Sequence, residues 1–188
     1  MIVLLSGTSG SGKTYIVEQL LAALGPHDET FTLGPRNKHG GYIWSARGVT
    51  IMGEYTAACG GCDRLSWKGG ADDIERVVVA QHALGRKVVL EGLLVGTWGV
   101  PRMTRLVPLG LHVIQLATPV DVCVAAVDAR RLARATAAGK ALVPLDPANT
   151  VGKARGLLSV LPLRRKAGIP VELLGRDEAL TRVRELVL

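Results

Sequence analysis

Aromatic residues and cysteines are scarce in this sequence of 188 residues. Phenylalanine, tryptophan and tyrosine together make up only 4% of the chain, which leaves few rings on which the bases of a single-stranded nucleic acid could stack. The three cysteines, Cys59, Cys62 and Cys123, are an odd number. A disulfide framework is therefore disfavoured, and a reducing compartment such as the cytoplasm is favoured.

Long hydrophobic runs are also lacking. No apolar stretch reaches the roughly 20 residues that a membrane-spanning helix needs, although hydrophobic residues make up 48% of the chain. The apolar run 2–5 is too short for the hydrophobic region of a signal peptide. No repeat, low-complexity tract or linker is evident. We expect a globular cytoplasmic protein without a membrane partner, in which residues 1–188 form one domain.

Acidic residues are too few to balance the basic ones, and the imbalance lies in one half of the chain. The net charge is +7. Residues 1–100 contain nine lysines and arginines and nine acids, whereas residues 101–188 contain fourteen and seven. A charge that served only solubility would not need to be one-sided, so the second half is predicted to carry an anion-binding surface.

Apolar strand candidates alternate with helical candidates along the chain. Expected strands are residues 2–5, 31–33, 49–52, 88–90, 112–116 and 171–174, and expected helices are residues 15–24, 72–84, 120–138, 151–166 and 177–187. Several strands are continuously apolar, which is typical of a parallel sheet covered on both faces. The pattern predicts a doubly wound α/β fold with a mainly parallel sheet and helices on both faces. Residues 42–45 and 49–52 are expected to form an inserted hairpin.

Proline and glycine mark the expected helix boundaries. Thr118 before Pro119 has the sequence of an N-cap followed by proline at the first helical position. Gly85 and Gly139 are placed to end the helices that precede them.

The stretch GTSGSGKT, residues 7–14, follows the first expected strand and precedes a helix. It matches G-x-x-x-x-G-K-[ST], the phosphate loop of nucleotide-triphosphate sites. Its glycines permit the turn in which N–H groups converge on a phosphate, Lys13 can reach the β- and γ-phosphates, and the Thr14 hydroxyl can ligate Mg²⁺. The residues predicted to bind ATP are Gly7, Thr8, Ser9, Gly10, Ser11, Gly12, Lys13 and Thr14. The alternative is a glycine-rich turn that merely joins strand to helix.

VVLEGLL, residues 88–94, places Glu91 at the end of a strand that reads as buried. In phosphate-loop proteins a carboxylate in this place meets the Mg²⁺ shell or takes a proton from the acceptor. The alternative is an ion pair with a lysine at the edge of the sheet. We favour the first interpretation, in which Thr14 and Glu91 form the metal site.

ARRLAR, residues 129–134, places Arg130 and Arg134 four positions apart on one helix face. Arg131 lies beside them, and Asp128 can offset only one of the three charges. Kinases commonly close such a segment over the transferring phosphoryl group. Arg130 and Arg134 are therefore predicted to be catalytic residues of an arginine-rich lid around residues 128–150, and a solvated basic face is the alternative.

GEYTAACGGCDRLSW, residues 53–67, lies in a predicted substrate-binding insertion around residues 36–70. Cys59 and Cys62 have the spacing of metal ligands, but there is no second cysteine pair. A buried tight turn is favoured over a metal or redox site.

The same segment carries the candidates for substrate chemistry. Asp63, a short carboxylate held by that turn, is the predicted general base for an acceptor hydroxyl. Glu54 is its rival, and Glu91 is a third candidate. Tyr55 or Trp67 could stack on a substrate ring or pack inward.

The motifs GTSGSGKT, YTAACGGCD, VLEGLL, ARRLAR and DPANT together resemble a family of small phage-encoded phosphate-loop kinases. The resemblance runs from residue 2 to about residue 155, and CGGCD is its most specific element. It implies a kinase of 5-hydroxymethyluracil already within DNA, acting in thymine hypermodification in the cytoplasm of the phage's host. The chain has Glu54 and Thr56 on either side of Tyr55, where the family has a histidine and a glutamate. This departure bears on any catalytic role of those two positions.

The leading hypothesis is therefore an ATP- and Mg²⁺-dependent kinase whose partner is DNA containing a modified thymine. A kinase of free nucleosides or nucleotides is the runner-up, and an NTPase switch or motor subunit is a third possibility. If DNA is the acceptor, its flanking phosphates are expected to meet basic residues of the second half, namely Arg102, Arg105, Lys153, Arg155 and residues 164–166. The sequence leaves the oligomeric state open.

Overall fold

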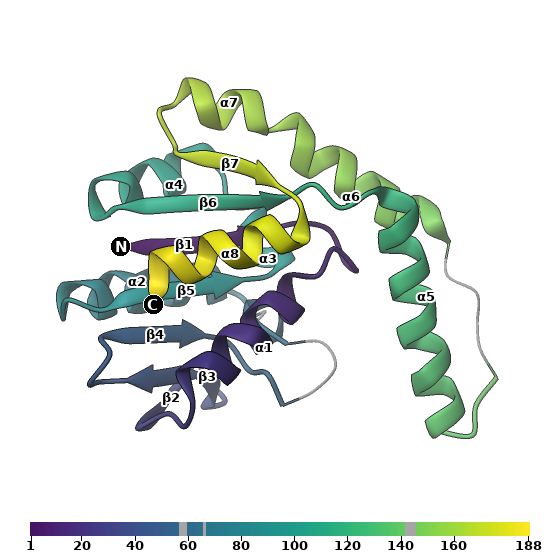
Figure 1. Ribbon diagram of the computed structural model, residues 1–188, viewed down its shortest axis with the longest axis horizontal. Helices are drawn as coiled ribbons and strands as arrows, with labels where there is room; N and C mark the ends of the chain where they lie inside the picture. The colour runs from purple at the N-terminus through teal and green to yellow at the C-terminus, as the bar shows by residue number, and fades with distance from the viewer. Residues whose placement is uncertain (57–59, 66, 142–145) are drawn as a thin grey trace.

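A computed structural model of the chain describes residues 1–56, 60–65, 67–141 and 146–188 (Figure 1). These residues form a seven-stranded sheet with the order β2-β3-β4-β5-β1-β6-β7. The strands are β1 (Ile2–Ser6), β2 (Glu29–Leu33), β3 (Lys38–Trp44), β4 (Val49–Met52), β5 (Lys87–Glu91), β6 (Leu111–Leu116) and β7 (Val171–Leu174). The pairs β4–β5, β5–β1, β1–β6 and β6–β7 are parallel, and β2–β3 and β3–β4 are antiparallel. The predicted mainly parallel α/β sheet is confirmed.

Helices cover both faces of the sheet, as predicted. They are α1 (Lys13–Leu24), α2 (Gly70–Ala83), α3 (Leu93–Gly96), α4 (Val100–Leu106), α5 (Val120–Ala137), α6 (Pro147–Ser159), α7 (Leu161–Lys166) and α8 (Arg176–Val187), with 3₁₀ turns η1 (Cys62–Leu65) and η2 (Val107–Leu109). In Figure 1, α1 and α8 cross the front of the sheet, whereas α5 extends away from it. Within the described ranges, no helix is both long and apolar enough to cross a bilayer.

Strand β1 divides its side chains between two hydrophobic cores. Ile2 and Leu4 face one core, together with the buried side chains of α2 and α4. Val3 and Leu5 face the other, together with those of α1 and α8. Because both faces are buried, the strand reads as one continuous apolar run. The loop that follows it is thereby fixed at the carboxyl edge of the sheet, where ligands of such folds bind.

The predicted hairpin is confirmed and is longer than expected. Trp44 pairs with Val49, and Gly48 adopts the left-handed conformation, with φ of 62°, in the turn between them. Strand β3 already begins at Lys38, and β2 adds a further antiparallel strand at the edge of the sheet.

The helix expected over residues 151–166 is in fact two helices. α6 begins earlier, at Pro147, where the Asp146 carboxylate accepts a 2.8 Å hydrogen bond from the Ala148 N–H. It ends at Ser159, and α7 starts with Pro162 at its second position. Proline has no N–H with which to continue the hydrogen-bond ladder of α6, which accounts for the break. The short helices α3 and α4 were not predicted.

The predicted role of Thr118 is wrong, whereas the two glycine boundaries are confirmed. No side chain caps α5; instead, the Thr118 hydroxyl donates a 2.8 Å hydrogen bond to the Ser11 carbonyl in the phosphate loop. Gly85 and Gly139 follow the ends of α2 and α5 in the left-handed conformation.

Candidate active site

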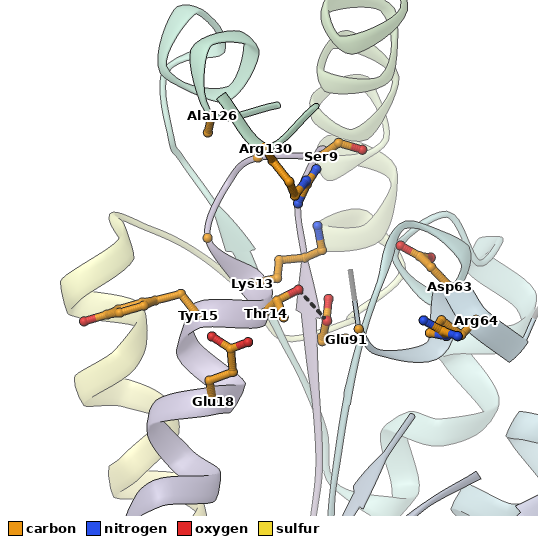
Figure 2. A pocket seen from close by; sticks show the side chains of 13 residues that line it. Ser9, Lys13, Thr14, Tyr15, Glu18, Asp63, Arg64, Glu91, Ala126 and Arg130 are labelled. Atoms are coloured by element: carbon orange, nitrogen blue, oxygen red, sulfur yellow. Dashed lines mark hydrogen bonds between the residues drawn. The ribbon is translucent and has the colours of Figure 1, made fainter. Parts of the chain in front are cut away.

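A cavity of about 410 Å³ lies at the carboxyl ends of β1 and β5, between the phosphate loop and α5 (Figure 2). It is lined by Ser9, Gly10, Gly12, Lys13, Thr14, Tyr15, Glu18, Gly60, Asp63, Arg64, Glu91, Ala126 and Arg130. The structure therefore brings Lys13, Thr14, Asp63, Glu91 and Arg130 together, from four separate segments of the predicted site.

The phosphate loop has a backbone that only glycine accommodates at critical positions. Gly10 and Gly12 have φ of 83° and 98°. A Cβ atom at Gly10 would lie 2.3 Å from the Cys123 carbonyl oxygen, and one at Gly7 would lie 2.5 Å from the Ser11 hydroxyl. The tight cradle that an anion requires is thus compatible with glycine alone at these places. The Ser11 hydroxyl is buried and has no partner among the described residues.

Lys13 is folded back onto this loop. Its Nζ donates hydrogen bonds of 2.8 Å to the Gly7 carbonyl and 3.0 Å to the Thr8 carbonyl, and the residue is 7% exposed. Burial lowers the pKa of Lys13, and the nearby carboxylates of Glu91 and Asp63 oppose that shift. The ammonium group is therefore poised beside the cradle and needs only to exchange carbonyl partners for phosphate oxygens.

Thr14 and Glu91, the predicted metal ligands, are in contact. The Thr14 hydroxyl donates a 3.0 Å hydrogen bond to Glu91 Oε1. Burial raises the pKa of Glu91 to about 7, although the Lys13 charge and the Thr14 hydrogen bond lower it. Within the described ranges, no cluster of three or more His, Cys, Asp or Glu residues could hold a metal by itself. One hydroxyl and one carboxylate instead fit Mg²⁺, which is commonly held by one or two protein oxygens together with phosphates and waters.

Asp63 makes a connection that the sequence did not reveal. Its Oδ1 accepts a 2.8 Å hydrogen bond from the Leu94 N–H, and its Oδ2 accepts a 3.0 Å bond from the Leu93 N–H. The carboxylate thus anchors the start of α3 and faces the cavity from η1 (Figure 2). Each carboxylate oxygen has a second acceptor position, so Asp63 remains able to take a proton from an acceptor.

Glu54, the rival base, is engaged elsewhere. Its carboxylate forms a 2.9 Å ion pair with Arg64 and accepts a 2.7 Å hydrogen bond from the Thr56 hydroxyl. Glu54 does not line the cavity, whereas its partner Arg64 does. The geometry therefore favours Asp63 over Glu54.

The two arginines of the predicted lid differ in position. Arg130 points into the cavity from α5 (Figure 2). Arg134, one turn further along α5, is exposed and does not line this cavity. Of the pair, Arg130 is therefore the better placed to meet a phosphoryl group.

Cys62 and Tyr55 are packed inside the protein. Cys62 is buried, and burial together with Glu91 and Asp63 raises the pKa of its thiol well above the usual value. Tyr55 packs against the core and donates a 3.1 Å hydrogen bond to the Met52 carbonyl. Cys59 lies outside the described residues, so the interpretation of the cysteine pair stays a prediction.

Three of the predicted phosphate contacts are engaged within the protein. Arg102 pairs with Asp72 and Glu75, and Arg105 pairs with Glu75. Arg164 is 1% exposed and donates a 2.5 Å hydrogen bond to the Gly96 carbonyl. The prediction for Arg164 is wrong, because a buried guanidinium cannot reach DNA on the surface. Lys153, Arg155, Arg165 and Lys166 are exposed.

A second hollow, of about 350 Å³, adjoins the phosphate loop and was not predicted. It is lined by Gly10, Ser11, Gly12, Thr118, Pro119, Val122, Ala126 and Arg176. The Arg176 guanidinium lies 5.1 Å from the centre of the Tyr15 ring. Arg176 belongs to no sequence motif, and only the packing of α8 beside α1 reveals its place next to the loop.

The sheet, the glycine-rich loop and the converging charged residues are compatible with the class of phosphate-loop kinases. No protein-family model matches the chain. The chain is 32% identical over 191 residues to the 5-hmdU DNA kinase of Pseudomonas phage PaMx11, and the alignment covers 99% of this chain and 96% of that protein. The chain therefore belongs to a family of phage kinases that includes this relative. The family resemblance inferred from the sequence is confirmed.

Proposed function

We propose that this kinase transfers the γ-phosphate of ATP to the hydroxymethyl oxygen of 5-hydroxymethyluracil in DNA. The observation that carries the proposal is the end-to-end similarity to a 5-hmdU DNA kinase. The convergence of Lys13, Glu91 and Asp63 around one cavity supports it, because these residues supply the groups that phosphoryl transfer to a hydroxyl requires.

The chain's own groups suggest how ATP is held. The N–H groups of residues 7–14 and the start of α1 favour phosphate oxygens, and Lys13 adds its charge. We assign the adenosine portion to the adjoining hollow, between Val122 on α5 and Arg176. Thr14 and Glu91 would hold Mg²⁺, which neutralises charge on the β- and γ-phosphates when it is bound.

Asp63 is assigned as the general base. The acceptor hydroxyl oxygen forms a bond to the γ-phosphorus, and the bond from that phosphorus to the β,γ-bridging oxygen breaks, so that ADP leaves. The hydroxyl proton passes to the Asp63 carboxylate, whose orientation is fixed by the Leu93 and Leu94 N–H groups. Arg130 is assigned to stabilise the charge that spreads over the transferred group.

DNA as acceptor requires the target base to leave the helix stack, which costs a few kcal/mol. We propose that residues 36–70, which supply Asp63 and Arg64 to the cavity, bind the extruded base. The region around residues 128–150, which supplies Arg130, would cover the phosphates as a lid. The reaction would then take place in the host cytoplasm, where phage DNA is modified.

Transfer of label from γ-labelled ATP to a panel of acceptors tests this function. The panel consists of 5-hydroxymethyluracil duplex, the same sequence as a single strand, the free nucleoside, and unmodified DNA. Label in the modified DNA alone, or much faster than in the nucleoside, is the expected result. Fast labelling of the nucleoside with none in DNA would replace the proposal with the runner-up, a nucleoside kinase.

A further inference from the structure

A third hollow, which is basic and aromatic, lies at the edge of the region around residues 36–70, outside the active-site cavity and the hollow beside Arg176 described above. Its volume is about 290 Å³, and it is lined by Leu33, Pro35, Arg36, Lys38 and Trp67, which we call the Trp67 hollow. None of these residues lines the active-site cavity. An apolar wall, one indole and two cations suit an anionic ligand that carries a flat ring.

Trp67 is held firmly in one orientation. Its indole N–H donates a 2.9 Å hydrogen bond to Asp73. The ring packs on the backbone of Gly34, where a Cβ atom would lie only 2.5 Å from it, and Gly34 has φ of 75°. A ring that is fixed before binding loses little conformational entropy when a base stacks on it.

The cations of the Trp67 hollow are also positioned in advance. Pro35 and Arg36 occupy the middle of a turn closed by a 3.1 Å hydrogen bond from the Asn37 N–H to the Gly34 carbonyl. Proline fixes the backbone of such a turn, and Arg36 is exposed at its tip. Lys38 lies 5.9 Å from the centre of the Trp67 ring.

These cations are available to an anion, unlike several in the second half of the chain. Neither Arg36, Lys38 nor the neighbouring Lys68 forms an ion pair with any described residue. Arg102 and Arg105, by contrast, are paired with acids. The insertion therefore contributes free positive charge beside the site, although its half of the sequence has no net charge.

The hollow is joined to the active site through η1. Lys38 Nζ donates a 2.9 Å hydrogen bond to the carbonyl of Arg64, and the Arg64 side chain lines the active-site cavity. Trp67 follows Asp63 by four positions, so their Cα atoms are at most about 14 Å apart. A strand whose target base reaches Asp63 would thus bring a neighbouring nucleotide to Trp67.

We propose that the Trp67 hollow binds a nucleotide that flanks the target base in the DNA strand, with its base on Trp67 and its phosphate at Arg36 and Lys38. This inference rests on the proposed function, because it gives the DNA a path beside the active site. In this proposal, Trp67 is the ring on which a base stacks, in a chain that has few aromatic residues.

The first test compares two single-arginine variants of the insertion. Arg36→Ala removes a charge from the hollow, and Arg47→Ala removes one from the exposed turn at the opposite end of β3. Steady-state kinetics are measured with a short modified oligonucleotide and with the free nucleoside. Arg36→Ala is expected to raise the KM for the oligonucleotide about tenfold relative to the KM for the nucleoside. Arg47→Ala is expected to leave this ratio unchanged, and equal effects of the two variants would overturn the proposal.

The second test needs no activity. Trp44 and Trp98 are 3% and 5% exposed, so a quench of tryptophan fluorescence by an unmodified oligonucleotide is expected to come from Trp67. The quench should be lost in Trp67→Phe, with melting temperature as the check of folding. To the wild-type protein, an oligonucleotide with abasic flanks should bind about tenfold more weakly than the intact oligonucleotide. The affinity for this abasic oligonucleotide should be the same in the wild-type protein and in Trp67→Phe. A quench that persists in Trp67→Phe, or no quench at all, contradicts the inference.

The two tests separate this inference from the proposed function. If the wild-type protein labels modified DNA but Arg36→Ala and Trp67→Phe behave like it, the function stands and the Trp67 hollow is not used. If the wild-type protein labels only the nucleoside, the proposed function fails, and the absence of a quench with DNA would reject the hollow as well.

Discussion

Oε1 of Glu91 accepts a 3.0 Å hydrogen bond from the Thr14 hydroxyl, which joins the end of β5 to the first turn of α1 across 77 positions of sequence. Glu91 is only 1% exposed. Its pKa is raised to about 7, because burial outweighs the opposing effects of Lys13 and Thr14. A carboxylate kept so far from water is unfavourable until a cation neutralises it, which is the arrangement expected of a metal ligand in the metal-free protein.

Glu91→Gln is therefore expected to stabilise the metal-free protein at alkaline pH. Between about pH 4.5 and pH 7 the folded wild-type protein retains a proton that the unfolded chain has lost, so its stability falls as the pH rises through this range. The neutral glutamine avoids this loss and still accepts from Thr14. Denaturant unfolding in EDTA should show a gain on the order of 3 kcal/mol at pH 8, which disappears near pH 4. An equal change in the free energy of unfolding at both pH values would show that Glu91 does not titrate in this range.

Lys13→Met should abolish phosphoryl transfer. The methionine retains most of the buried aliphatic stem but removes the ammonium group that phosphates require. The residue is 7% exposed, and its ammonium group donates hydrogen bonds to two loop carbonyls. Some loss of melting temperature is expected for that reason. Near wild-type turnover by folded protein would refute the assignment of the phosphate loop.

Asp63→Asn should remove transfer while leaving binding of Mg²⁺ and ATP intact, since a base acts on the acceptor. The variant also turns one amide NH₂ towards a backbone N–H of α3, at a cost of about 1–3 kcal/mol. Isothermal titration with ATP and a thermal melt separate the two effects. Glu54→Gln is the matched control, because Glu54 is a carboxylate nearby in the sequence that forms an ion pair with Arg64. An active Asp63→Asn together with an inactive Glu54→Gln would move the base to Glu54.

Much of the fold could be predicted from local sequence patterns, and so could the phosphate loop. The continuous apolar runs predicted the parallel strands, and the positions of Gly7, Gly12, Lys13 and Thr14 predicted the loop. The break at Val160 could have been inferred from Pro162. These features depend on neighbours in sequence, which is why the sequence reveals them.

The remaining features depend on partners that lie far apart in the chain. Thr118 has the sequence signature of a helix cap, yet its hydroxyl donates a hydrogen bond to the carbonyl of Ser11, 107 positions away. The Asp63 carboxylate accepts a hydrogen bond from the Leu93 N–H at the start of α3, and the buried Arg164 donates one to the Gly96 carbonyl. An arginine in a basic run is normally exposed, so only tertiary packing could show that this one is not.

Arg130→Ala should lower kcat about 10²-fold with a smaller effect on ATP affinity, because its charge faces the cavity where the phosphoryl group would lie. Arg134→Ala is expected to have a weaker effect, since Arg134 does not line that cavity. Single-turnover kinetics at saturating ATP measure the rate of phosphoryl transfer in both variants. An unchanged kcat for Arg130→Ala would favour the alternative that these arginines form a solvated basic face of α5. A larger loss of kcat in Arg134→Ala than in Arg130→Ala would mean that α5 moves during the reaction.

Transfer to 5-hydroxymethyluracil DNA should fall steeply with salt, whereas transfer to the nucleoside should not. Each phosphate neutralised by a cation contributes about −0.9 to the slope of log affinity against log salt. Four cations on α6 and α7, namely Lys153, Arg155, Arg165 and Lys166, are exposed, so we expect a decrease of about 10²-fold in kcat/KM between ~50 and ~200 mM salt. The double variant Lys153→Ala/Arg155→Ala should make the slope shallower by about 2. Arg102→Ala is the matched control: Arg102 is held by Asp72 and Glu75, so its loss should lower the melting temperature and leave the slope unchanged. A flat salt response for DNA, or a slope that changes with Arg102 but not with the α6 pair, would exclude this surface from DNA binding.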